Sequence, residues 1–204
     1  MCAPGLPPRP GADVRLVIVG AGQINFGSPE GPWNHSIRLE RKLGPRLHVV
    51  ALIDPDAERA RRVLKTKCQS FVLSAYKDTV VYPTFKDYMA SVCAETYPHA
   101  VWVGSPPAFR GGTEPGRNLE QLLTAGLPNV PLFIEKPVST GAVDQTFEVA
   151  KMLERNGSLV SVGYMLRYLK VVQKMKKIIS ENDLHVIAVN ARHIMAYWDT
   201  GNLE

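Results

Sequence analysis

The sequence predicts an α/β fold, namely a doubly wound parallel sheet with helices on both faces. Short apolar runs rich in β-branched residues alternate with helix-like segments along most of the chain, and the loops between them are short. In addition, the first apolar run, residues 14–19, leads directly into two closely spaced glycines. Alternation of this kind is typical of strands that pair in parallel through helical crossovers and are buried on both faces.

Each element is expected from a local signal. Asn34 can cap a helix over residues 35–43. Asp56 and Glu58 fall in the first turn of the next helix, where acidic residues complement the helix dipole. We expect strands over residues 14–19, 47–53, 100–103, 132–135, 159–163 and 186–196. We expect helices over residues 35–43, 56–67, 85–94, 118–125, 142–155 and 169–180, whereas residues 71–81 are ambiguous.

Composition limits the functional classes. With 204 residues, 45% of them hydrophobic and 21% charged, the chain can build one good-sized core, or one domain and part of another. No apolar run approaches the roughly 20 residues that span a bilayer, and the proline-rich first 13 residues lack the apolar stretch of a secretory signal. Cys2, Cys68 and Cys93 form no C-x-x-C pair. We therefore expect a cytoplasmic location, no metal site and no membrane partner.

The net charge of +5 is mildly basic. Basic residues gather at residues 59–67 and 170–177, but both segments are helix-like and lack interleaved aromatic residues that could stack on bases. We interpret them as solvated helix faces, so nucleic acid is not an expected partner.

The glycines after the first strand predict a dinucleotide-binding turn. Residues 14–25 read V-R-L-V-I-V-G-A-G-Q-I-N, so Gly20 and Gly22 give a tight turn where backbone can approach a phosphate closely. The third glycine of G-x-G-x-x-G is replaced by Asn25. The turn by itself is therefore a weak signal.

Asp54 ends the second predicted strand. A carboxylate at that place accepts hydrogen bonds from the adenosine ribose and repels a 2′-phosphate, which favours NAD over NADP. Asp54 lies further from the glycines than usual, and a Gly- and Pro-rich insertion over residues 26–33 accounts for the excess. An ordinary D-P-D turn is the alternative interpretation. Because Arg59 and its neighbours lie close in sequence, NADP stays open.

Residues Glu135, Lys136 and Pro137 stand at the end of a late strand. The carboxyl ends of parallel strands line the ligand crevice, so a lysine there could polarise a hydroxyl or carbonyl group, or orient a nicotinamide. Pro137 biases Lys136 toward an extended backbone and permits a cis peptide. A solvated strand end is the alternative.

Several motifs occur together and in order: V-I-V-G-A-G, L-I-D, V-G-S-P-P, E-K-P-V-S-T-G and V-G-Y-M-L-R-Y. In this arrangement the chain resembles the glucose-fructose oxidoreductase, inositol dehydrogenase and rhizopine-catabolism (Gfo/Idh/MocA) family from residue 14 to about residue 197. The insertion ending in W-N-H resembles a fungal-type branch. The resemblance implies an NAD(P)-binding Rossmann fold followed by an α+β open-sheet domain. It also implies hydride transfer between nicotinamide and a CH–OH group of a sugar, polyol or related small molecule.

The resemblance also implies roles for individual residues. Lys136 would be catalytic, and Tyr164 and Arg167 would bind substrate, the alternative for these two being a packed tyrosine and a surface arginine. The implied cofactor contacts are Gly20, Gly22, Gln23, Ile24, Asn25, Asp54, Gly104, Ser105, Pro106, Glu135 and Lys136.

The sequence departs from the family toward its C-terminus. The family's Asp-x-x-x-His proton-transfer arrangement does not occur, and His193 lies within a predicted strand, where a structural role is favoured. We expect a leader over residues 1–13, a Rossmann domain over 14–140, and connecting helices with a truncated substrate domain over 141–204. Two hypotheses follow. The first is that the chain is an NAD(P)-dependent oxidoreductase, with a second copy of itself as a candidate partner in a homo-oligomer. The second is that it is a truncated, non-catalytic nucleotide-binding protein.

Overall fold

The computed structural model of the chain describes residues 10–28 and 33–192. They form two compact units, one extending to Gly163 and the other from Tyr164 onward, and each is described by itself.

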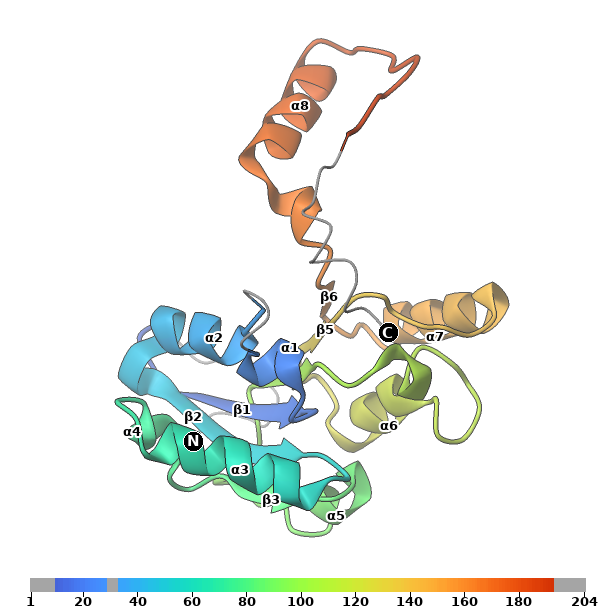
Figure 1. Cartoon of the computed structure of the whole chain (residues 1–204). Helices are drawn as coiled ribbons and strands as arrows, with labels where there is room; N and C mark the ends of the chain where they lie inside the picture. The colour runs from blue at the N-terminus through green and yellow to red at the C-terminus, as the bar shows by residue number, and fades with distance from the viewer. Residues whose placement is uncertain (1–9, 29–32, 193–204) are drawn as a thin grey trace. The chain divides into compact units, whose positions relative to one another are not determined.

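The first unit is built on a six-stranded parallel sheet with the strand order β3-β2-β1-β4-β5-β6 (Figure 1). In this order β2 and β3 lie on one side of β1, and β4, β5 and β6 lie on the other, so the strand order reverses between β1 and β4 as in doubly wound dinucleotide-binding folds. The predicted fold class is therefore confirmed. The strands are β1 (Val14–Val19), β2 (Leu47–Ile53), β3 (Val80–Tyr82), β4 (Ala100–Val103), β5 (Leu132–Ile134) and β6 (Val160–Val162).

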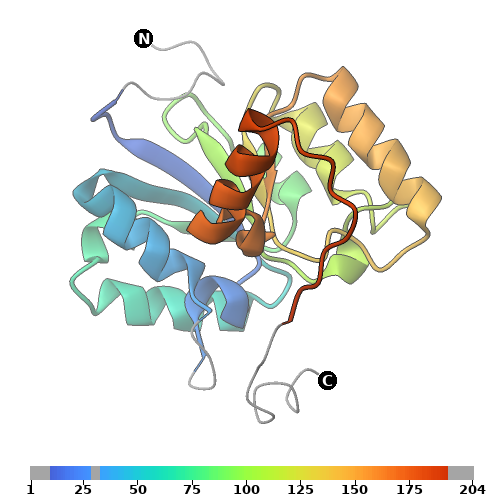
Figure 2. The same ribbon diagram turned by 90° about the horizontal axis from the view of Figure 1, so that it is seen from above.

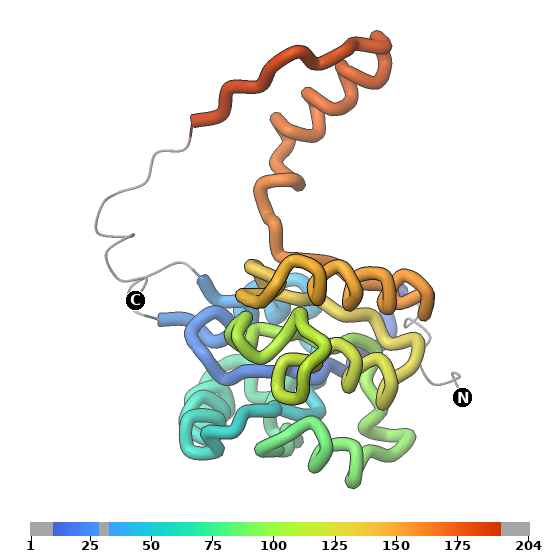
Figure 3. The backbone as a smooth tube through the Cα atoms, turned by 90° about the vertical axis from the view of Figure 1, so that its right-hand side faces the viewer, coloured from blue at the N-terminus to red at the C-terminus, as the bar shows by residue number. Residues whose placement is uncertain are grey.

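Helices cover both faces of the sheet (Figure 2). One face packs against α2 (His35–Leu43), α3 (Ala57–Cys68) and α4 (Leu73–Tyr76), and the other against α5 (Phe85–Met89), α6 (Leu119–Gly126) and α7 (Val143–Arg155). Helices α6 and α7 lie side by side in the tube view (Figure 3). Short helical turns complete the unit: α1 (Gln23–Phe26), η1 (Gly44–Arg46) and η2 (Pro107–Phe109).

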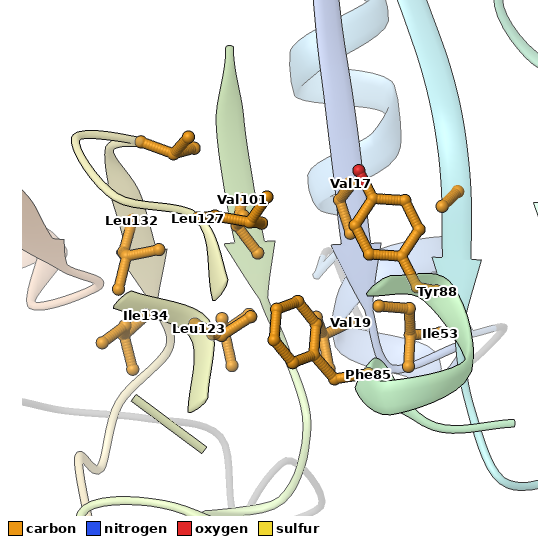
Figure 4. Packing of buried hydrophobic residues seen from close by; sticks show 13 residues of the cluster. Val17, Val19, Ile53, Phe85, Tyr88, Val101, Leu123, Leu127, Leu132 and Ile134 are labelled. Carbon is orange, nitrogen blue, oxygen red and sulfur yellow. The ribbon is translucent and has the colours of Figure 1, made fainter. Parts of the chain in front are cut away.

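The core has two layers because side chains of a strand alternate between the sheet's faces. Leu16 and Ile18 of β1 belong to the cluster under α2 and α3, whereas Val17 and Val19 belong to the other cluster. Figure 4 shows Phe85 of α5 lying close to Val19 in this second layer. The burial of β1 on both faces explains its continuous apolar sequence.

Most predicted elements are present, and three differ. Helix α5 ends at Met89 instead of continuing to residue 94, because Thr96 Oγ1 accepts from the Cys93 N–H and draws the chain into a turn. The ambiguous residues 71–81 contain α4 and the start of β3. The predicted strand over residues 186–196 is wrong for residues 186–192, which form no strand, and its remaining residues lie outside the described part. An isolated strand has no partner for its backbone groups.

Strand β6 completes the sheet and α7 packs on one of its faces, so the first unit continues beyond the boundary expected at residue 140. The described residues of the second unit contain η3 (Met165–Tyr168) and α8 (Lys170–Glu181). Of the helices described, none is long and apolar enough to cross a membrane.

Candidate functional site

A cavity of about 350 Å³ lies at the carboxyl ends of β1, β2, β4 and β5. In open α/β sheets, ligands bind at this edge, where the strand order reverses. Ten of the eleven residues expected to contact a cofactor line it, and Asn25 does not. The lining residues are Gly20, Gly22, Gln23, Ile24, Asp54, Arg59, Gly104, Ser105, Pro106, Pro107, Arg110, Glu135 and Lys136.

The glycine turn fits close approach by a ligand. Gly20 has a φ of +96°, and a Cβ added there would lie 3.0 Å from the Ser105 backbone nitrogen, so only glycine fits without strain. A Cβ added at Gly22 would meet nothing within 4 Å, so the turn leaves open space at this point. The Ser105 Oγ is buried and lacks a hydrogen-bond partner among the described residues. A polar ligand in the cavity would satisfy it, which agrees with a dinucleotide.

Asn25 supports the turn from behind. Its buried Nδ2 donates to the carbonyl oxygens of Val19 and Gly20, at 3.2 and 2.7 Å. A Cβ added at Gly104 would overlap the Asn25 amide, so the asparagine fills space that glycine leaves beside it. The structure therefore gives Asn25 a structural role in the turn, and its expected cofactor contact stays a prediction.

Asp54 joins the end of β2 to the glycine turn. The residue is only 2% exposed, and its Oδ2 accepts from the Ala21 N–H at 2.6 Å. Its Oδ1 accepts from the Asp56 N–H at 2.8 Å and from Arg59 Nη2 at 2.7 Å. A carboxylate offers about four acceptor positions, so roughly one is left for a ribose hydroxyl. Asp54 thus shapes the turn as well as facing the cavity.

The loop after β5 carries Glu135 and Lys136 into the cavity wall, with a cis peptide before Pro137. Glu135 is buried. Its Oε1 lies 2.7 Å from His35 Nε2, and its Oε2 accepts from the Lys136 N–H at 2.7 Å. Burial raises the pKa of the Glu135 carboxyl, but the hydrogen bonds from His35 and Lys136 outweigh it and hold the pKa below its usual range. Glu135 is therefore an ionised group whose oxygens face the protein.

Sequence reasoning missed Arg110. It is almost fully buried, its Nε donates to the Ser105 carbonyl at 3.0 Å, and its Nη1 donates to the Val138 carbonyl at 3.0 Å. The guanidinium thereby joins the loop after β4 to the loop after β5, which are the two loops at the expected nicotinamide end. The only signal in the sequence is an arginine followed by two glycines after a strand.

His35 was predicted as an ordinary residue of a helix. The structure places its ring, 5% exposed, against Trp102 of β4 and Phe133 of β5, with ring centroids 5.0 and 5.3 Å away. Nothing local in the sequence predicts its contact with Glu135, since the two residues are 100 positions apart.

Tyr164 and Arg167 belong to the second unit, so their expected substrate contacts stay predictions. His193 lies outside the described residues. Within residues 10–28 and 33–192, no group of three or more His, Cys, Asp or Glu side chains could hold a metal ion.

The strand order, the glycine turn and the acid after β2 define a dinucleotide-binding Rossmann domain. The model of the Gfo/Idh/MocA oxidoreductase family, described as having an NAD-binding Rossmann fold, matches residues 14–164. The chain belongs to this family, and NAD is the cofactor that its fold binds. A second model, of an oxidoreductase C-terminal domain, matches residues 167–203.

Curated relatives agree with this assignment. An uncharacterized protein of Schizosaccharomyces pombe is 43% identical over 189 residues, which are 92% of this chain and 49% of that protein. An inositol 2-dehydrogenase of Gluconacetobacter diazotrophicus is 28% identical over 178 residues, covering 86% of this chain and 44% of that protein. The chain thus spans about half the length of the curated relatives it matches.

Solved structures share the fold. A scyllo-inositol dehydrogenase from Lactobacillus casei, solved with bound NAD(H) and scyllo-inositol, has a TM-score of 0.56 at 16% identity. The match covers 84% of this chain and 42% of that one. A myo-inositol 2-dehydrogenase from Lactobacillus plantarum has a TM-score of 0.54 at 18% identity, with the same coverage of both chains.

Proposed function

We propose that this chain provides the cofactor half of an NAD-dependent oxidoreductase, which transfers a hydride between nicotinamide and a CH–OH group of a sugar, polyol or related compound. The observation that carries the proposal is the cavity where the strand order reverses, which the glycine turn, Asp54, Ser105 and Lys136 line together. Backbone, carboxylate, hydroxyl and ammonium groups in this order suit a dinucleotide lying across the sheet edge.

Each part of the cavity wall has a proposed role. Gly20, Gly22, Gln23 and Ile24 would hold the pyrophosphate, and Asp54 would accept from the adenosine ribose. Gly104, Ser105 and Pro106 would line the nicotinamide ribose. A bound nicotinamide supplies the hydride donor or acceptor, and the protein supplies its position.

Lys136 is the proposed catalytic residue. Its position after β5 would let its ammonium group orient the substrate oxygen and assist proton transfer. The inositol dehydrogenase among the relatives supports a polyol as the substrate class. Tyr164 and Arg167, which follow β6 in the sequence, are proposed to bind substrate.

The test is an NADH titration of the 204-residue chain, followed by cofactor fluorescence, and a turnover assay on inositols, other polyols and sugars. We expect saturable NADH binding. Lys136→Met should abolish any turnover, whereas Lys151→Met, a change at an exposed lysine of α7, should have no effect. Binding without turnover would support the alternative of a non-catalytic nucleotide-binding protein. A folded chain that does not bind NADH would refute both.

A further inference from the structure

A buried pair of side chains, His35 and Glu135, lies at the cavity, and Glu135 is one of its lining residues. His35 begins α2, Glu135 follows β5, and the two are 5% and 7% exposed. We propose that His35 is a positioning residue for Lys136: it fixes the Glu135 carboxylate, which in turn fixes the backbone from which Lys136 enters the cavity. The inference deepens the proposed function and rests on it where it concerns Lys136 and the cofactor.

The Glu135 carboxylate divides its two oxygens between two donors. One oxygen faces His35 Nε2 and the other accepts from the N–H of the next residue, Lys136, both at 2.7 Å. Since an ionised carboxylate only accepts hydrogen bonds, the imidazole donates from Nε2. The two oxygens of the planar Glu135 carboxylate thus hold the His35 side chain and the Lys136 backbone, one each.

The surroundings leave the carboxylate little freedom. A Cβ added at Gly163, after β6, would lie 2.8 Å from Oε1 and 3.0 Å from Cδ of Glu135, so the carboxylate fills the space beside this glycine. The Glu135 N–H donates to the Val103 carbonyl at 2.9 Å, which fixes the backbone. Removing His35 would therefore leave Glu135 in place, buried, and with one partner fewer.

The position of His35 is also fixed by its neighbours. Asn34 caps α2 by accepting from the Ile37 N–H at 3.0 Å, which sets the first residue of the helix. The His35 ring then packs against the stacked pair of Trp102 and Phe133, whose ring centroids are 3.8 Å apart. The histidine offers two separable properties, an aromatic ring for packing and an N–H for Glu135.

Two ionisable groups face Glu135 in the described structure, His35 from α2 and Lys136 from its own loop, while Gly163 of the β6 end contributes none. Without the His35 N–H, the effect of burial on the Glu135 carboxyl is opposed only by Lys136. Burial favours the neutral acid, so such a variant should take up a proton as the pH falls. A neutral carboxyl accepts more weakly from the Lys136 N–H, and the loop should lose its fixed geometry.

Two variants separate the ring from its donor. His35→Phe keeps an aromatic ring against Trp102 but removes the N–H, whereas His35→Gln keeps an N–H donor and removes the ring. The first measurement is the titration of the Glu135 carboxyl by NMR in the full chain labelled with ¹³C at the glutamate side-chain carboxyl, with Glu135→Gln used to assign the signal. The second is the NADH dissociation constant at several pH values.

We expect His35→Phe to raise the pKa of Glu135. Below that pKa its NADH affinity should fall by at most about tenfold for each pH unit, which is the limit for the uptake of one proton. The wild-type chain and His35→Gln should show no such pH dependence. Combining His35→Phe with Glu135→Gln should add little to Glu135→Gln alone, because both act through one carboxylate. This comparison needs the double variant and Glu135→Gln to be folded, and it does not use the His35→Phe single variant.

An unchanged Glu135 titration in His35→Phe would overturn the inference. The inference would also be overturned if His35→Gln, and not His35→Phe, showed the pH-dependent loss of NADH binding, because ring packing alone would then account for the role of His35. If the wild-type chain does not bind NADH, the proposed function fails, but the carboxyl titration still decides whether His35 controls Glu135.

Discussion

Replacing Asp54 tests whether this carboxylate holds the glycine turn. The Asp54→Ala variant removes the acceptor of three donors: the N–H groups of Ala21 and Asp56, and the guanidinium of Arg59. These donors are not equivalent. Ala21 is buried, whereas the side chain of Arg59 is 44% exposed and can turn to water.

The magnitude follows from that difference. A buried N–H left without a partner destabilises by about 1–3 kcal/mol. An ion pair with one largely exposed partner contributes about 0–1 kcal/mol. We therefore expect Asp54→Ala to lower the free energy of unfolding by about 1–4 kcal/mol. Arg59→Met should lower it by less than about 1 kcal/mol.

The assay is equilibrium unfolding in urea, followed by circular dichroism. Asp78→Ala is the matched control, because Asp78 is exposed and its nearest partner, Lys77, lies 4.0 Å away. The control should stay within about 0.5 kcal/mol of the wild type. If Asp54→Ala were as stable as this control, the carboxylate would not hold the turn. Weaker NADH binding with normal stability would then leave ribose contact as its sole role.

Three further predictions concern other parts of the first unit. Gly20→Ala should destabilise the chain by about 1–3 kcal/mol, because Gly20 has a positive φ and lies close to the Ser105 nitrogen. Gly22→Ala should leave stability unchanged and weaken NADH binding. If the two variants lowered the free energy of unfolding in urea equally, the prediction would be wrong. Burial raises the pKa of Glu120, so the contribution of this residue to stability is present at low pH and is lost as the pH rises through the folded-state pKa. In unfolding measured across pH, Glu120→Gln should abolish this loss of stability. An unchanged pH profile of stability in that variant would refute the prediction. Lys67→Met removes the cation 2.7 Å from Glu40, whose side chain is 9% exposed, and should destabilise the chain by about 2–4 kcal/mol; Lys65→Met on the same helix should not change the melting temperature.

Local signals in the sequence predict most of the fold. The continuous apolar run of β1 reflects a strand buried on both faces, and Asn34 caps α2 as its residue type predicts. The end of α5 was not predictable in the same way. There, turn hydrogen bonds made by Ser91, Cys93 and Thr96 compete with the helix, and propensity does not resolve such a competition.

The residues of the candidate site also fall into two groups, those that local sequence signals predict and those that depend on distant partners. Gly20, Asp54 and Lys136 are predictable, because each sits at a fixed place relative to a strand end in this topology. The packing of Asn25 was not predictable, because it depends on Gly104, a residue of another strand's loop. Arg110 was missed for the same reason, since its partners come from the loops after β4 and β5.

The polar groups around the cavity act mainly on one another. Asp54 ties the second strand to the glycine turn, Arg110 ties the loop after β4 to the loop after β5, and Glu135 ties α2 to the Lys136 backbone. A site built in this way is shaped before a ligand arrives, so less binding energy is lost to ordering it. Substitutions at these three residues should therefore weaken cofactor binding by loosening the cavity, even where the side chain never touches the cofactor. The stability and NADH measurements on the same variants separate that effect from direct contact.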